Sequence, residues 1–142
     1  MELFTRFEGV VHEEVILLGD FEFVCYTLGN GLKVFSHTRI LNIIMADYTN
    51  RNLHKHLSEL VPYLPFLFIQ RKIRLSLVFL KNDRRIRAIA YEDFKVLCQA
   101  FVKADEDGQL SHKFFFAAIL SGLFLKYDRM MDAKKRQINN VF

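Results

Sequence analysis

The stretch FFFAAILSGLFL, residues 114–125, contains twelve residues and no charge, and it decides how the rest of the chain is expected to fold. A helix that is apolar on every side has to be buried on every side, so other elements must surround it. Ser111 is placed to act as its N-cap, and Leu110 can pack on Phe115 as a hydrophobic staple. Because a membrane crossing needs about 20 apolar residues, the run is too short to span a bilayer. The sequence therefore predicts a central, buried core helix.

The residues before this helix predict a β-meander followed by two helices. Residues 13–18 and 21–28 are expected to form a strand pair around Gly19 and Asp20, because both runs are rich in β-branched, aliphatic or alternating apolar residues. The glycines of Gly29-Asn30-Gly31 favour a tight turn into a third strand, residues 32–35. Two amphipathic helices should follow. The first begins after Ser36, and the second is ended by two prolines; their apolar faces hold Ile40, Leu41, Ile44, Met45 and then Leu53, Leu57, Leu60, Val61.

The second half of the chain predicts a basic β-hairpin and two further helices. Residues 75–80 and 86–91 read as strands around the turn Asn82-Asp83. The next helix has the clearest pattern and ends at Gly108; its apolar face holds Phe94, Leu97, Cys98, Phe101 and Val102. The core helix follows, and from about residue 126 a polar, basic tail is expected. The predicted fold is α+β, with residues 1–142 forming one domain whose last helix is central and buried.

Composition is that of an ordinary globular protein: 142 residues, 51% hydrophobic and 25% charged. Cys25 and Cys98 each lie in an apolar pattern, which favours buried free thiols over a disulfide and so a reducing cytoplasm. The N-terminal residues lack a basic segment followed by an apolar one, so no signal peptide is expected. Nor do we expect a transmembrane span or a membrane anchor.

The net charge of +4 is distributed unevenly. Residues 1–70 contain five Lys/Arg and eight Asp/Glu, whereas residues 71–142 contain fifteen and eight. Most of the excess falls between Arg71 and Arg87. Arginine side chains match phosphate geometry, and a hairpin presents alternate residues on one face, so this segment is the candidate anion or nucleic-acid site. Its residues are Arg71, Lys72, Arg74, Arg84, Arg85 and Arg87. The alternatives are a solvated sheet face or the rim of a protein interface.

Other functional patterns do not meet the spacing that their chemistry requires. If the acidic loop at residues 105–108 were a calcium site, Lys103 and Phe114 would stand at ligand positions, and neither can coordinate calcium. On a helix His54 and His56 would point about 200° apart, so they could not share a metal ion. The two helices after residue 36 are joined by a long segment in an acidic half, which disfavours a helix-turn-helix reading. With no nucleophile elbow or phosphate loop, we expect no cofactor, no metal and no enzymatic activity.

One segment is similar to a known family. The sequence GDFEFVCYTLGNGLKVFS, residues 19–36, leading into TRILNIIM, residues 38–45, resembles the N-terminal domains of phage antirepressor-like proteins of the KilA-N and BRO type. The resemblance covers roughly the first third of the chain. It implies a regulatory setting in a phage or mobile element, and no functional residue can be carried over from it.

Two functional hypotheses are consistent with the sequence. The first is a non-enzymatic regulator that binds nucleic acid or another anionic partner through the basic hairpin, with salt-dependent affinity. The second is a protein-interaction module, an inhibitor or a self-assembling protein, because the apolar connector at residues 66–69 exceeds what a small core can bury. In that case Phe66 and Phe68 would lie across a homo-oligomer boundary. A protein target is therefore also possible.

Overall fold

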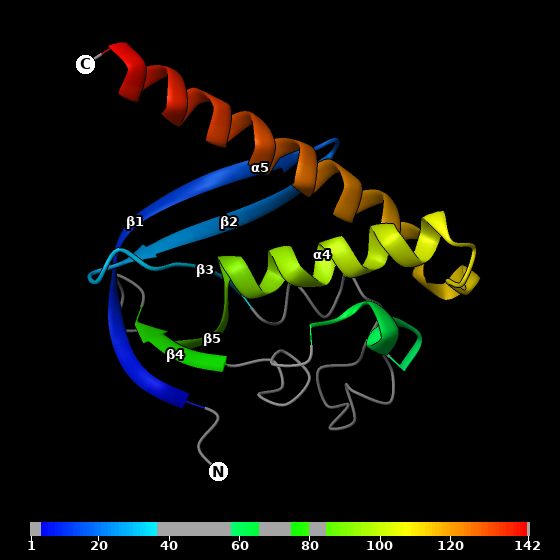
Figure 1. Ribbon diagram of the computed structural model, residues 1–142. Helices are drawn as coiled ribbons and strands as arrows, with labels where there is room; N and C mark the ends of the chain where they lie inside the picture. The colour runs from blue at the N-terminus through cyan, green and yellow to red at the C-terminus, as the bar shows by residue number, and fades with distance from the viewer. Residues whose placement is uncertain (1–3, 37–57, 66–74, 80–84, 142) are drawn as a thin grey trace.

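The computed structural model describes residues 4–36, 58–65, 75–79 and 85–141 of the chain. Five strands form a closed barrel in the order β1-β2-β3-β5-β4, and two long helices, α4 (Tyr91–Glu106) and α5 (Phe115–Val141), lie side by side across it (Figure 1). The predicted α+β class is confirmed. Within the described residues, no helix combines the length and apolar character that a bilayer crossing requires.

The strands agree with the sequence prediction except at the start of the chain. They are β1 (Phe4–Leu18), β2 (Phe21–Leu28), β3 (Lys33–Ser36), β4 (Leu75–Phe79) and β5 (Arg85–Ala90). β1 is much longer than predicted because it serves two partners: its second half pairs antiparallel with β2, and its first half pairs parallel with β4. The register of β1 with β2 shifts between Val10 and His12, next to Gly9, the last residue of β1 that pairs with β4. This double pairing closes the barrel.

The two predicted turns in the meander are confirmed. Gly19 has φ +64° and Gly31 has φ +85°, a region of backbone conformation that favours glycine. In the second turn the Gly31 N–H donates to the Leu28 carbonyl (2.9 Å), and the Leu32 N–H donates to Asn30 Oδ1 (3.0 Å). The asparagine side chain thus stabilises the turn that carries the chain from β2 to β3.

The helices are η1 (Ser58–Tyr63), α4 (Tyr91–Glu106), η2 (His112–Phe114) and α5 (Phe115–Val141). The predicted α4 is confirmed, and it ends where Gly108 takes φ +69° and the Gln109 N–H donates to the Ala104 carbonyl (2.9 Å). The polar, basic segment predicted from about residue 126 is part of α5, which continues to Val141. Residues 126–137 are mostly good helix formers, and Arg136 pairs with Asp132 one turn earlier (3.5 Å).

The core is built on aromatic rings from three elements. Phe94 lies 5.3 Å from Phe35 and 4.8 Å from Phe124, measured between ring centroids. The buried side of α5 packs on this cluster. That side consists of Ala117, Ala118, Leu120, Ser121 and Phe124, and Phe114 at the end of η2 is buried beside it.

The expectation that the core helix is buried on every side is wrong. Phe115 is 62% exposed, Phe116 45% and Ile119 48%. Among the described elements, α4, β1 and η2 pack most closely on α5, and Phe21 and Phe35 of the neighbouring strands contact it through their rings; large side chains on its opposite side stay exposed. The proposed staple fails for the same reason, since Leu110 packs on the core while Phe115 does not.

Ser111 has a different partner from the one predicted. Its Oγ donates to Glu59 Oε2 (2.7 Å) and its N–H donates to Glu59 Oε1 (2.7 Å), so it ties η1 to the start of the last helices and does not cap its own helix. The two helices predicted after Ser36 lie mostly outside the described residues. The described end of the second is η1, and Pro62, which was expected to end that helix, lies inside η1.

Candidate protein-interaction surface

The basic hairpin forms, but most of its candidate side chains lie outside the described residues. β4 and β5 pair antiparallel, with Arg85 opposite Phe79 and Arg87 opposite Leu77. The structure therefore places two of the six cations two positions apart on one strand. The other four, Arg71, Lys72, Arg74 and Arg84, fall outside the described residues, as do Phe66 and Phe68.

A groove of about 350 Å³ opens between the β2–β3 turn, the start of α4 and the middle of α5. Its lining includes three lysines and three carboxylates, so its charges cancel; these are Lys33, Lys95, Lys135, Glu92, Asp128 and Asp132. An anionic ligand would gain no net attraction from such a lining. The groove does not replace the basic hairpin as an anion site.

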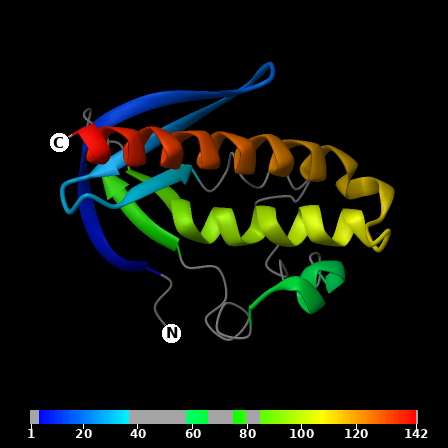
Figure 2. The same cartoon turned by 45° about the horizontal axis from the view of Figure 1, so that its top comes forward.

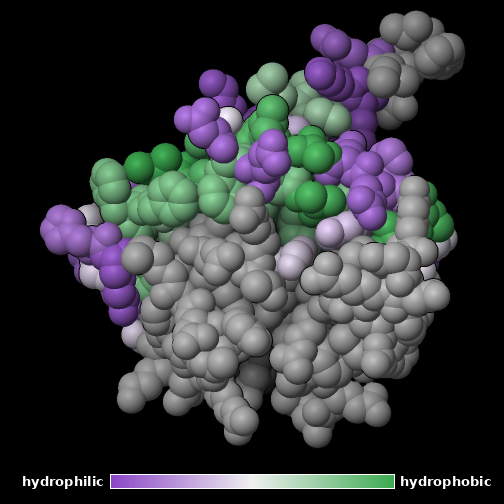
Figure 3. Space-filling model, turned by 180° about the vertical axis from the view of Figure 1, so that it is seen from behind, coloured by the Kyte–Doolittle hydropathy of each residue, from purple (hydrophilic) through white to green (hydrophobic). Residues whose placement is uncertain are grey.

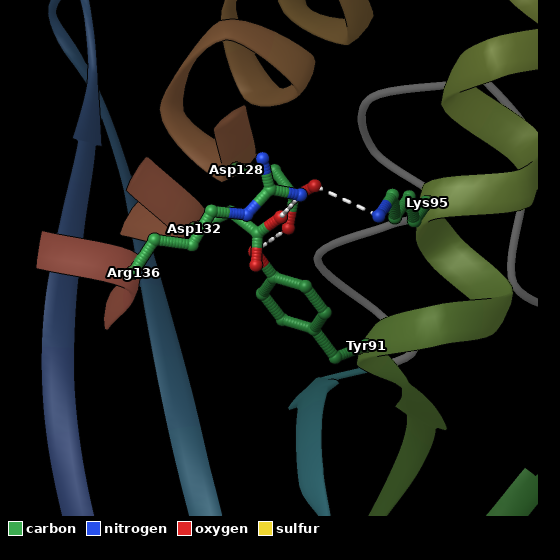
Figure 4. Close-up of polar contacts among 5 residues, drawn as sticks. All are labelled: Tyr91, Lys95, Asp128, Asp132 and Arg136. Carbon is green, nitrogen blue, oxygen red and sulfur yellow. Dashed lines mark hydrogen bonds and ion pairs between the residues drawn. The ribbon is translucent and has the colours of Figure 1, made fainter. Parts of the chain in front are cut away.

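The polar groups in the groove are joined in a network between the two helices (Figure 4). Tyr91 donates its hydroxyl proton to Asp128 Oδ1 (2.8 Å), and Lys95 Nζ lies 2.9 Å from Asp128 Oδ2. Burial acts to raise the pKa of Asp128, but Lys95 and Tyr91 outweigh it, and the pKa falls below its ordinary value. Burial and Asp128 raise the pKa of Tyr91, and the hydrogen bond that Lys95 donates to Asp128 raises the pKa of Lys95. The network therefore fastens α4 to α5 and supplies no proton donor or acceptor near neutral pH.

Replacing Asp128 by Asn is expected to destabilise the fold at neutral pH by about 1 kcal/mol, because the groups are partly exposed and solvent weakens the ion pair. A carboxylate whose pKa is lower in the folded state stabilises the fold at pH values above its unfolded pKa, and the contribution is lost as the pH falls through the folded pKa. Urea denaturation at neutral and acidic pH measures the free energy of unfolding of the wild type and of Asp128→Asn. The difference between wild type and Asp128→Asn should shrink as the pH falls through the lowered pKa of Asp128; an equal difference at neutral and acidic pH would contradict the role given to the ionised carboxylate.

The described residues contain neither a metal cluster nor a reactive thiol. No group of three or more His, Cys, Asp or Glu lies close enough to hold an ion within those residues. Cys25 and Cys98 are buried free thiols, as predicted. Burial raises the pKa of Cys25 to about 11 and that of Cys98 to about 12. Both thiols therefore stay protonated and are poor nucleophiles.

The most distinctive surface is the open side of α5. Five large apolar side chains along it are between 37% and 62% exposed; we call this set the α5 face, and it consists of Phe115, Phe116, Ile119, Leu123 and Met130. Figure 3 shows many apolar residues across the upper part of the molecule, with polar residues among them. Residues 116, 119, 123 and 130 follow the three- and four-residue spacing of a helix-pairing seam.

The β1–β2 hairpin borders this face at its tip. The Phe21 and Phe116 ring centroids lie 6.0 Å apart, and a Cβ built on Gly19 would lie 3.8 Å from Leu123 Cδ1. The hairpin covers one flank of α5 and holds Phe116 and Leu123 half-exposed, while Ile119 is slightly more exposed than either.

The sequence carried a signal for this face that the prediction missed. The small residues of the apolar run, Ala117, Ala118 and Ser121, all lie on the buried side of α5, where α4 and the strands approach closely. The bulky residues Phe115 and Ile119 lie on the other side. The small residues therefore mark the packed side of the uncharged run, although the large residues Leu120 and Phe124 lie on that side as well.

Comparison of the chain with protein-family models, with curated proteins and with solved structures found no match. A function for this chain is therefore inferred from its fold and its surfaces.

Proposed function

We propose that this protein is a protein-interaction module that pairs with a second copy of itself through the α5 face. The observation that carries the proposal is the exposure of Phe115, Phe116 and Ile119 in a stretch of twelve residues without a charge. A large, contiguous apolar patch of this kind on a small protein marks an interaction site. Within the proposal, the protein acts in the cytoplasm, where its two thiols stay reduced.

The size of the α5 face suits a standard interface. Side chains of this size contribute up to about 100 Å² each at half exposure, so the four members of the α5 face within residues 114–125 offer on the order of 300 Å². A standard interface takes about 800 Å² from each partner, of which somewhat more than half is apolar. The α5 face therefore supplies most of the apolar part, and its polar surroundings would supply the rim.

Two properties favour a second copy as the partner. Since residues 114–125 carry no charge, two such helices can approach without repulsion. A two-fold axis through the middle of the run would bring Ile119 of each copy near Leu123 of the other, which is the self-complementary arrangement that symmetric dimers use. The basic second half of α5 would then lie outside the paired region, and its charges would remain in solvent.

Ile119→Lys tests the proposal by placing a charge in the centre of the α5 face. Light scattering at tens of micromolar should give twice 16.8 kDa for the wild type and 16.8 kDa for the variant. Gln99→Lys is the matched control. Gln99 is exposed on α4, away from the α5 face, so this variant should remain a dimer. Thermal melts should confirm that both variants fold. A wild-type monomer, or a dimer that Ile119→Lys leaves intact, would refute the α5 interface.

A second candidate function is a phage or mobile-element regulator that binds nucleic acid through the basic hairpin. It is supported by the cation excess between residues 71 and 87 and by the antiparallel β4–β5 pairing that holds Arg85 and Arg87 on one strand. A dimer would present two such hairpins, which would strengthen binding to one extended nucleic acid.

The expected result for this second function is binding to mixed DNA or RNA that weakens steeply between about 50 and 200 mM salt, since each phosphate contact adds nearly one unit to the log–log slope. In anisotropy measurements, the affinity of Arg85→Ser/Arg87→Ser for nucleic acid should fall with salt concentration along a shallower log–log slope than that of the wild type. Lys134→Ser/Arg136→Ser removes the same charge from the exposed end of α5 and serves as the control. Equal slopes for the two double variants would remove the hairpin as the binding site.

A further inference from the structure

Within the described residues, the second half of β1 has a strand partner on one side only. From Val10 to Leu18 it pairs with β2 on one side. On its other side β4 pairs only with Phe4 to Gly9, so within the described part of the chain no strand bonds to residues 10–18 there. Figure 2 shows the β1–β2 hairpin running beside α5. We call residues 10–18 on this side the β1 edge.

From His12 to Leu18, the β1 edge lacks several of the features that usually keep edge strands from pairing. Its register with β2 is continuous from His12 to Leu18, without a bulge, and it contains no Pro and no Lys. Three of its outward side chains are large, apolar and exposed: Val11 64%, Val15 60% and Leu17 63%. An added strand would thus gain both main-chain hydrogen bonds and apolar contacts.

Charge indicates what kind of strand the edge accepts. Residues 7–32 contain five carboxylates and no Lys or Arg, and Glu13 stands exposed between Val11 and Val15 in the outward row. Pairing the edge with a second copy would bring two such acidic hairpins together, which repulsion disfavours. A basic segment would instead gain attraction along the whole hairpin.

We infer that the β1 edge binds an extended, basic peptide segment of a partner protein by strand addition. The segment would carry Lys or Arg opposite Glu13 and apolar residues beside Val15 and Leu17. This inference does not rest on pairing through the α5 face, because the two surfaces use different elements. It is therefore tested in the Ile119→Lys background as well as in the wild type.

The probe is a fluorescein-labelled peptide, Val-Lys-Val-Lys-Lys-Lys-Val, titrated with protein and followed by anisotropy. Its odd positions share one face and, in an antiparallel pairing, place Lys opposite Glu13 and Val opposite Val11, Val15 and Leu17. A second peptide has the same sequence with its alternate backbone nitrogens methylated along one edge, and a third has methyl groups along the other edge. Methylation keeps the charge but removes donors needed for a β-ladder, so at least one methylated peptide should bind about tenfold more weakly or worse. If both bind as well as the parent, the attraction is only electrostatic and strand addition is refuted.

A charge reversal locates the site. Glu13→Lys should weaken binding about tenfold, because it places like charges opposite each other on adjacent strands. Glu106→Lys, at an exposed position at the end of α4, makes the same change in net charge and should leave affinity within about twofold of the wild type. Slower amide exchange at residues 11–17 in the bound state is expected. Equal effects of the two reversals, or protection elsewhere only, would overturn the assignment to the β1 edge.

Discussion

Replacing Leu120 by Asp is expected to unfold the protein. Leu120 is 3% exposed and belongs to the main core cluster, on the side of α5 that packs inward. A carboxylate there would be removed from water without a partner or would have to be protonated, and either costs several kcal/mol. Because the total stability of a domain is only about 5–15 kcal/mol, a loss of this size removes most or all of it.

The neighbouring position provides the control. Ile119 precedes Leu120 in the same helix but is 48% exposed, so Ile119→Asp keeps its charge in water and should retain a cooperative thermal transition. Circular dichroism melts at low concentration compare the two variants without a contribution from self-association. A soluble Leu120→Asp protein that melts cooperatively would show that the inward side of α5 is misplaced.

The second large effect is expected at Phe124. Its side chain is fully buried, and its ring lies 4.8 Å from Phe94, 5.8 Å from Phe35 and 5.1 Å from Tyr91, measured between centroids. Phe124→Ala would leave a cavity where α5, α4 and β3 meet, and such truncations cost about 3–5 kcal/mol. For a chain of this size we expect the melting temperature to fall by roughly 10–15 °C.

Phe115→Ala makes the same substitution at a ring that is 62% exposed. It should change the free energy of unfolding of the monomer by no more than about 0.5 kcal/mol, because little of that side chain leaves water on folding. Urea denaturation of both variants in the Ile119→Lys background measures the difference. Equal losses would mean that the aromatic cluster is not centred on Phe124.

Local rules were sufficient for much of the fold. The glycines of two turns, an alternating pattern over residues 21–28, and the apolar spacing of Phe94, Leu97, Cys98 and Phe101 predicted β2, both turns and α4. Each of these signals acts over a few residues, through backbone conformation or through the period of a single element. The same holds for the β4–β5 hairpin, although most of the cations that made it a candidate site lie outside the described residues.

The extent of β1 and the open side of α5 could not be predicted in this way. Whether Phe4 to Gly9 form a strand depends on β4, which lies about seventy residues later in the chain and pairs with them in parallel. An uncharged sequence also does not determine how many elements will pack on a helix. The prediction assumed that every apolar side of residues 114–125 is buried, whereas large side chains on one side are exposed.

The sequence by itself therefore determined the class of the fold, its turns, its free thiols and the apolar character of residues 114–125. Only the tertiary structure decided which side of that helix meets the core, and that one half of β1 has a partner on a single side within the described chain. The physical reason is that propensity and periodicity are properties of one segment, whereas an exposed face or an open edge depends on which other segments pack against it.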